Sequence, residues 1–309
     1  MIKKNARIII SVMFLIFSFI HQAFALGKQV GMVMEVKGNA ELVVDGKGEK
    51  LSPMQLLMIG DRIQTGENAR VQVVMFANNR ALYLMPSSMG EVNETGLKIL
   101  KGKIEREQKV NYPLPKNLAL ESRKVLGETV RFGRKNGSLR SNTEFALPSE
   151  NASVFKENVT LSWIPLVNED IIYLSVERQE ENGDWVIMAD KQKLEGTSTF
   201  YVFKKLEPGR YSAFIETGTG RPVEIARIRF NVLSEEKETA IKEQMEITRR
   251  LLGKNPNDLK PRMAMVAYLM ENKLYMEALG QVEKLRLLLP GNENVDTFKK
   301  LIYKKFLMN

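Results

Sequence analysis

The period of the hydrophobic residues changes once along this 309-residue chain, and that change limits the fold more than any other feature. Between residues 28 and 233, apolar residues alternate with polar ones, and turn residues punctuate the pattern. In residues 70–76, for example, one face of a strand would carry Val71, Val73 and Met75, and the other Gln72, Val74 and Phe76. From residue 235 onward, apolar residues recur at spacings of three and four, which is typical of helices. The sequence therefore predicts a multidomain chain with two all-β domains followed by a short α-helical tail.

The first 25 residues have the features of a secretory signal. Residues 1–7 contain Lys3, Lys4 and Arg7, an apolar run follows over residues 8–20, and Ala23-Phe24-Ala25 completes the pattern. We expect cleavage after Ala25. An uncleaved membrane anchor is the alternative, but thirteen residues fall short of the roughly 20 that span a bilayer. The mature chain is expected to be periplasmic or secreted and to have no stable membrane span.

The residues needed for common catalytic sites are missing. The chain has no cysteine, and its single histidine, His21, lies within the predicted signal. Triads and dyads that use imidazole or a thiol are excluded, as are most catalytic zinc sites. We therefore predict no catalytic, cofactor-binding or metal-binding residues and no enzymatic activity. Hydrolysis of wall polysaccharide by two carboxylates is the catalytic alternative that survives.

The positive charge is concentrated in one segment. The net charge of +9 falls to +6 when the three cations of the signal are removed, and residues 101–147 hold eleven Lys and Arg against five Asp and Glu. We interpret residues 107–150 as a basic linker, with one hairpin at Asn136-Gly137. Contact of this segment with anionic lipid or wall polymer is the alternative. Nucleic acid is not an expected partner of an exported chain.

The first β-domain, residues 28–106, resembles the FecR-type periplasmic domain. The resemblance rests on "GMVMEVKGNAELV", "LMIGDRIQTGENARVQVVMF" and "ALYLMPSSMGEV", which occur in that order and cover about 75 residues. The family commonly has a tight Asp-Gly turn where this chain has Asn78-Asn79, a pair that can turn through the left-handed region. In proteins of this type that regulate iron transport, the resemblance implies signalling to a sigma factor. Because only seven residues precede the apolar run, such a role for this chain would need an accessory protein.

The polar residues of "GDRIQTG" can be explained by turns or by chemistry, and we favour turns. Gly60 permits a positive φ, and Asp61 can accept hydrogen bonds from backbone N–H groups two or three residues further on. Thr65-Gly66 would form the next turn, and Ile63 would point into the core. The remaining polar side chains are expected in solvent; they are Arg62, Gln64, Glu67 and Arg70.

The second β-domain, residues 151–233, resembles fibronectin type III and immunoglobulin-like sandwiches. Trp163 is expected to be the core tryptophan. Pro208-Gly209-Arg210-Tyr211 resembles the tyrosine corner of such sandwiches, in which the hydroxyl bonds back to the backbone.

The helical region, residues 235–309, resembles tetratricopeptide repeats. Pro256 and Pro290 are 34 residues apart, which is the period of that repeat. Tyr275, Ala278 and Pro290 occupy positions at which the repeat places an aromatic residue, a small residue and a proline, whereas Gln244 departs from the pattern. Because a solenoid needs about three repeats, we expect the tail to pack on the sandwich, on a second copy or on a partner.

We expect a non-catalytic binding or scaffold protein whose partners are envelope proteins or wall polysaccharide. The tail could also form a homo-oligomer. The candidate partner-binding residues are Met263, Tyr268, Met270 and Tyr275 in the tail and the aromatic residues Tyr83 and Trp185. The alternative interpretation places the methionines in the core and Trp185 at a sandwich edge.

Overall fold

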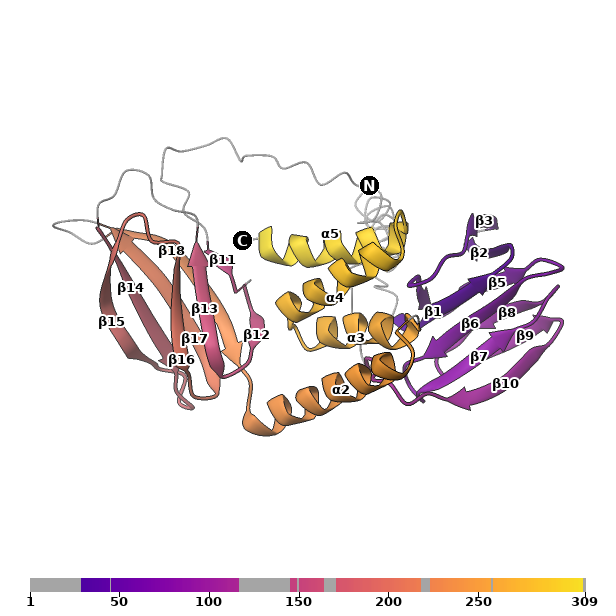
Figure 1. Cartoon of the computed structure of the whole chain (residues 1–309), viewed down its shortest axis with the longest axis horizontal. Helices are drawn as coiled ribbons and strands as arrows, with labels where there is room; N and C mark the ends of the chain where they lie inside the picture. Colours follow the sequence, from indigo (N-terminus) through magenta and orange to yellow (C-terminus); the bar gives the residue numbers. More distant parts are fainter. Residues whose placement is uncertain are drawn as a thin grey trace, which may run out of the picture.

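The computed structural model describes residues 29–44, 46–116, 145–148, 150–163, 171–217, 223–256 and 258–307. It confirms the predicted fold class of two β-domains followed by a helical tail. The tail lies between the two domains (Figure 1). The predicted signal and the Asn136-Gly137 hairpin lie outside the described residues.

Two five-stranded antiparallel sheets form the first domain. One sheet has the order β10-β7-β6-β1-β4 and the other the order β3-β2-β5-β8-β9. The strands are β1 (Gln29–Lys37), β2 (Ala40–Val44), β3 (Lys47–Lys50), β4 (Leu56–Met58), β5 (Arg62–Thr65), β6 (Arg70–Met75), β7 (Arg80–Leu84), β8 (Met89–Val92), β9 (Leu97–Lys101) and β10 (Ile104–Lys109).

The sheet that contains β1 and β6 is buried on both faces. Val71, Val73 and Met75 pack in the core between the two sheets, as the alternation predicted. The opposite face of the same sheet carries Met32, Met34, Val74 and Phe76, and these side chains are also buried. A strand whose two faces are both apolar needs cover on both sides, and the helical tail provides the second cover.

Four helices form the tail: α2 (Glu235–Lys254), α3 (Lys260–Glu271), α4 (Tyr275–Leu288) and α5 (Glu293–Leu307). Helix α3 is buried nearly all round and joins Met32, Met34, Val74 and Phe76 in one hydrophobic cluster. Spacings of three and four predict a helix with one apolar face, but α3 is apolar on most of its surface because β1 packs on one side of it and other helices pack around the rest.

The tail therefore packs on both β-domains rather than on the sandwich alone. The first domain supplies most of the partners of the tail, whereas the sandwich adds only Ala152 and Leu233 to the buried residues of the shared cluster. Ser234, at the end of the sandwich, caps the N-terminus of α2, and its hydroxyl accepts a hydrogen bond from the Lys237 N–H. It then runs toward the first domain (Figure 1).

The second domain is a sandwich of a three-stranded sheet, β11-β13-β16, and a five-stranded sheet, β12-β18-β17-β14-β15. Trp163 is buried in its core, and the Tyr211 hydroxyl donates to the Glu207 carbonyl oxygen at 2.8 Å, as a tyrosine corner requires. The strands are β11 (Phe145–Leu147), β12 (Ala152–Val154), β13 (Glu157–Trp163), β14 (Ile171–Gln179), β15 (Trp185–Glu195), β16 (Phe200–Lys205), β17 (Gly209–Thr217) and β18 (Val223–Val232).

Both ends of the predicted linker are structured. Strand β10 continues to Lys109, and Leu114 is then buried against the tail. The Lys116 N–H donates to both carboxylate oxygens of Glu271 in α3, at 2.9 and 3.0 Å. At the other end, β11 (residues 145–147) is a strand of the sandwich. The linker prediction was wrong at both ends because these short segments pair or pack with distant parts of the chain.

Phe76→Ala tests the packing of the tail on the sheet. Because Phe76 is 3% exposed in the cluster shared with the tail, its truncation should cost about 3–5 kcal/mol and lower the midpoint of urea unfolding. The matched control is Phe200→Ala, since Phe200 is 61% exposed on β16 and its loss should cost less than about 1 kcal/mol. Equal midpoints for the two variants would contradict this packing.

Tyr211→Phe tests the tyrosine corner. The variant removes one partly buried hydrogen bond to the Glu207 carbonyl and should destabilise the sandwich by about 0.5–1.5 kcal/mol. Tyr201→Phe, at a half-buried ring on β16, is the control and should change thermal unfolding much less. If the two variants melt alike, the hydroxyl of Tyr211 has no special role.

Candidate binding surfaces

The "GDRIQTG" corner is structural. Gly60 has φ +88°, as predicted, and Ile63 is fully buried. Asp61 Oδ2 accepts the Met58 N–H at 2.8 Å, so the carboxylate bonds three residues back along the chain. This bond closes the turn that precedes Asp61, where the Asp61 N–H also bonds to the Met58 carbonyl.

Thr65 and Gly66 attach the corner to neighbouring strands. The Thr65 hydroxyl donates to the Met85 carbonyl at 2.6 Å and accepts the Ser88 N–H at 2.9 Å. Gly66 donates its N–H to the Asn39 carbonyl, and a Cβ at Gly66 would lie 3.1 Å from that oxygen. These contacts occupy the polar groups of Asp61, Thr65 and Gly66, and they account for these three residue types without chemistry.

Tyr83, a predicted partner-binding residue, is already in contact with other side chains of this chain. Gln72 Nε2 donates to the Tyr83 hydroxyl at 2.8 Å, and the Arg70 guanidinium lies 4.4 Å from the centre of the ring. Arg70 also pairs with Glu105 at 3.2 Å, so it is not the freely solvated side chain that we expected. Arg70 therefore covers one of the two faces on which a sugar ring could stack.

The predicted partner-binding residues of the tail lie mainly in the core. Met263, Met270 and Tyr275 are at most 8% exposed, and Ala278 is fully buried between helices. Tyr268 is half-buried, and Pro290 lies in the turn between α4 and α5. A partner cannot reach the two methionines, because both are buried in the cluster that the tail shares with the first β-domain. The alternative, in which methionines fill gaps in the core, fits the structure.

Trp185, by contrast, begins an exposed apolar edge. Trp185, Val186, Ile187 and Met188 are four consecutive residues of β15, and each is 37–55% exposed. Strand β15 pairs with β14 along one side, and within the described residues no strand pairs with its other side. Phe200 and Val202 on β16, which ends the other sheet, are also exposed. We call residues 185–188 of β15 the apolar edge.

Sequence reasoning found Trp185 but missed the three residues that follow it. Four consecutive apolar residues in a strand normally indicate burial on both faces. Only the position of β15 at the end of its sheet leaves both faces open.

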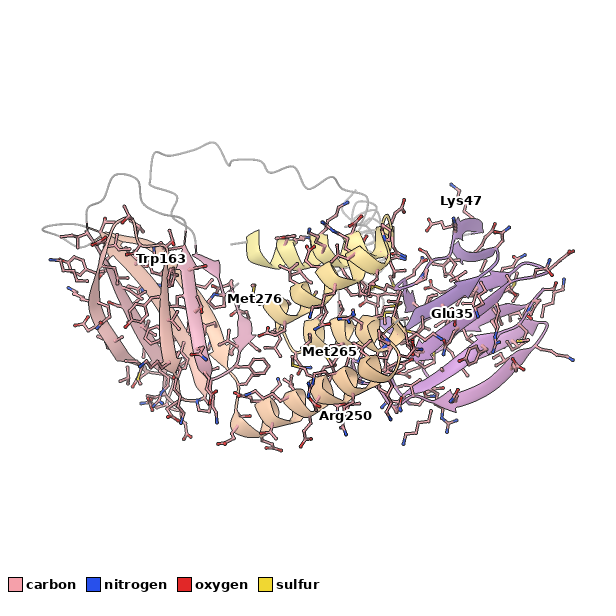
Figure 2. All side chains as sticks on the ribbon, in the orientation of Figure 1. Glu35, Lys47, Trp163, Arg250, Met265 and Met276 are labelled. Carbon is pink, nitrogen blue, oxygen red and sulfur yellow. The ribbon has the colours of Figure 1, made fainter. Side chains whose placement is uncertain are left out.

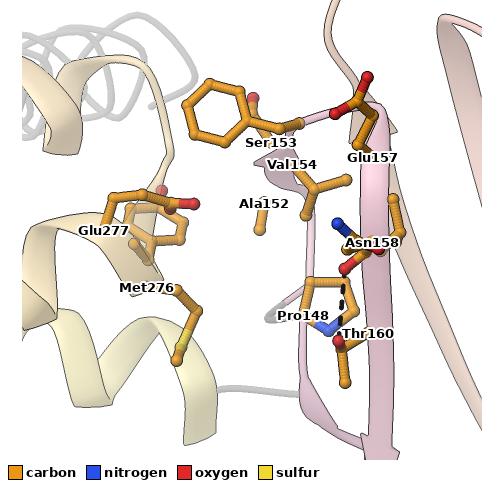
Figure 3. Close-up of a pocket in the computed structure, with 12 residues that line it drawn as sticks. Pro148, Ala152, Ser153, Val154, Glu157, Asn158, Thr160, Met276 and Glu277 are labelled. Atoms are coloured by element: carbon orange, nitrogen blue, oxygen red, sulfur yellow. Dashed lines mark hydrogen bonds between the residues drawn. The ribbon is translucent and has the colours of Figure 1, made fainter. Parts of the chain in front are cut away.

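A cleft of about 300 Å³ separates the sandwich from the start of α4. Its sandwich wall includes Val154, Phe155 and Val159, and its helical wall includes Met276 and Glu277. Figure 2 places Met276 at the end of α4 nearest the sandwich. Figure 3 shows the Glu277 carboxylate directed into the space between α4 and β12, whereas that of Glu157 lies at the rim.

Burial raises the pKa of Glu277, and a hydrogen bond with its own backbone offsets part of that rise. Two acids thus line one cleft, but their carboxylates do not converge on a common point in Figure 3. Retaining and inverting glycosidases need two carboxyl groups that flank one bond. The arrangement does not supply that geometry.

A buried ionic contact fastens the sandwich to the tail. Glu238 in α2 is 3% exposed, and its carboxylate accepts the Lys156 backbone N–H at 3.0 Å and the Lys242 ammonium at 2.6 Å. Burial acts to raise the pKa of Glu238, but these hydrogen bonds outweigh it and hold the pKa below its ordinary value. The turn after α3 adds a bond from the Ser153 N–H to the Lys273 carbonyl at 2.9 Å.

Among the described residues, no group of three or more His, Cys, Asp or Glu side chains is placed to hold a metal ion. The helices within that part of the chain are all too short or too polar to cross a membrane.

No protein-family model matches this chain, and the curated proteins also give no match. Solved structures give weak similarities. The fibronectin(III)-like modules of Clostridium thermocellum CbhA are 10% identical, with a TM-score of 0.22, over 30% of this chain and 96% of theirs. The FN1-FN3 domains of chicken CNTN1 are 8% identical, with a TM-score of 0.21, over 67% of this chain and 64% of theirs.

A β-1,2-glucanase from Parabacteroides distasonis is 8% identical, with a TM-score of 0.23, over 91% of this chain and 59% of its own. The chain thus spans less than two thirds of the length of the CNTN1 and glucanase structures. Likenesses at this level carry no argument about function. The description of the sandwich rests on the strand order and the tyrosine corner of this chain.

Glu238→Gln tests the contact that fastens the sandwich. At pH 7 the variant should lose about 1.5–3 kcal/mol, because hydrogen bonds to a charged group are lost or weakened. Since the pKa of Glu238 is lower in the folded state, its stabilisation is present above the unfolded value near 4.3 and disappears as pH falls through the folded pKa. The difference between wild type and variant in urea unfolding should therefore shrink below about pH 4.

Glu246→Gln, which breaks an exposed pair with Arg249 in the same helix, is the control and should change little at any pH. If both variants unfold alike at pH 7, the buried contact does not stabilise the junction.

Proposed function

We propose that this chain is a non-catalytic binding and scaffold protein of the cell envelope, exported by the signal at residues 1–25. The single observation that carries the proposal is the apolar edge of β15. Its four exposed apolar side chains lie on a strand that, within the described residues, pairs on one side only.

An edge of this kind is suited to an extended segment of another protein. An added strand would bond to the backbone of β15, and its alternate side chains would contact the apolar residues on either face. Natural edge strands are commonly guarded by charged residues. In β15 the charged residues are confined to the second half, which contains Asp190, Lys191 and Lys193. The first half has no charged residue.

The remaining parts of the chain hold this edge in place. The tail packs on the first domain and bonds to the sandwich, so the three parts form one framework. We further propose that the first domain is of the FecR type and that α3 and α4 form a tetratricopeptide-like pair. The positive φ of Gly60 supports the first assignment, and the buried Ala278 between helices supports the second.

Site-specific photo-crosslinking in native cells tests the apolar edge. A photoreactive residue at Ile187 should give a discrete protein adduct, whereas one at Leu100, which is also exposed at a sheet edge, should not. Val186→Lys should weaken the interaction about tenfold, a loss of about 1.4 kcal/mol, because it introduces a charge into the edge.

Identical adducts from both positions, or adducts unaffected by Val186→Lys, would contradict the proposal. Retention on purified wall polysaccharide that is lost in Trp185→Ala but kept in Val186→Lys would instead favour a sugar-binding role.

A further inference from the structure

The cleft between the sandwich and α4 has an unusual balance of charge. Its twelve lining residues include Glu157 and Glu277 but no Lys, Arg or His. The whole chain, in contrast, carries a net charge of +9. A carboxylate in an apolar cleft is normally paired with a cation of the same chain, so an unpaired carboxylate there calls for an explanation.

A second cavity, between β1 and the turn from α2 to α3, shows a carboxylate that is paired with cations of the same chain. There Glu35 is paired with Lys260 at 2.9 Å and with Lys37 at 3.2 Å. In the same helix as Glu277, Glu283 pairs with Lys299 at 2.6 Å. Glu277, however, has no Lys or Arg partner within the described part of the chain.

The walls of the cleft are apolar around this carboxylate. Val154, Phe155 and Val159 come from the sandwich, and Met276 comes from α4. Figure 3 shows Val154 and Met276 on the two opposite walls. The polar groups of Ser153, Asn158 and Thr160 also line the cleft. A concave apolar site with a few polar groups and one perturbed carboxyl is the usual form of a small-ligand site.

We propose that this cleft binds a primary ammonium group carried on a short alkyl chain, such as the side chain of a lysine residue in a partner peptide. The ammonium would pair with the Glu277 carboxylate. The methylene groups would pack against Met276 and the apolar sandwich wall. This inference depends only on the cleft and is independent of the apolar edge of β15.

The complementarity has a simple physical basis. Burial disfavours the ionised form of Glu277, and a cation brought into the cleft restores that form by direct attraction. An anion would be repelled by the Glu277 carboxylate. The Lys242 ammonium, which lies 5.4 Å from the centre of the Phe155 ring, acts on Glu157. Glu277 is therefore the carboxylate of the cleft without a nearby cation among the described residues. A neutral alcohol of the same length would gain the apolar contacts but not the ion pair.

Titration of the full chain with pentylamine, followed by NMR of ¹³C-labelled methionine methyl groups, tests the proposal. The Met276 signal, assigned with Met276→Leu, should shift and saturate with a Kd on the order of 1 mM, as expected for a ligand of six heavy atoms. The signal of Met188, on the distant β15, should not move. Pentan-1-ol should bind at least about tenfold more weakly.

Glu277→Gln should weaken pentylamine binding about tenfold, whereas Glu283→Gln in the same helix should leave it unchanged. The Met32 and Met34 signals report whether each variant retains its core. If Glu277→Gln does not fold, Glu277→Asp, which keeps the charge, should retain measurable binding of pentylamine. The affinities of the wild type for pentylamine and pentan-1-ol then decide whether the ammonium group is recognised.

Three outcomes would overturn the proposal. They are the absence of a saturable shift of Met276, equal affinities for the amine and the alcohol, and unchanged amine binding in Glu277→Gln.

Discussion

The burial of one sheet on both faces is the constraint on which the rest of this structure depends. Met32 and Met34 on β1, and Val74 and Phe76 beside them, lie on the face that points away from the core of their own domain. Each such side chain contributes about 1.5–3 kcal/mol when it is removed from water. Because whole domains are stable by only about 5–15 kcal/mol, the cover supplied by the tail is a large part of the stability of the first domain.

The order of the domains along the chain suggests that the tail is attached to the sandwich, but the packing attaches it to the first domain. The tail follows the sandwich in sequence but packs mainly on the first domain, and residues 110–116 cross onto it from β10. A form without residues 235–309 would expose the second apolar face of the sheet. The tail therefore cannot be removed as an independent binding module, and experiments on its role require point substitutions in the full chain.

The two edges of the five-stranded sheet in the sandwich differ in their contacts. At the β12 side, the turn between α3 and α4 accepts the Ser153 N–H, and α2 adds the buried carboxylate of Glu238. At the β15 side, four apolar residues remain exposed on an edge strand. One side of the sandwich thus holds the framework together, and the opposite side is available to other molecules. The cleft beside β12 lies at the fastened side, where the apolar contact between sandwich and tail is thin.

Interactions between residues close together in the chain allowed the sequence alone to determine which segments form strands or helices, and several details of these segments. The alternation of Val71, Val73 and Met75, the positive φ of Gly60 and the tyrosine corner at Tyr211 each depend on residues close together in the chain, and all three are present. The tertiary structure decided which apolar faces meet. It buried Met263 and Met270, turned the ends of a predicted linker into packed segments, left Val186 and Ile187 exposed, and placed Glu277 across a cleft from β12. Hydrophobic patterns show that a face must be covered, but they are nearly identical for many possible covers, so the choice depends on contacts between residues far apart in the chain.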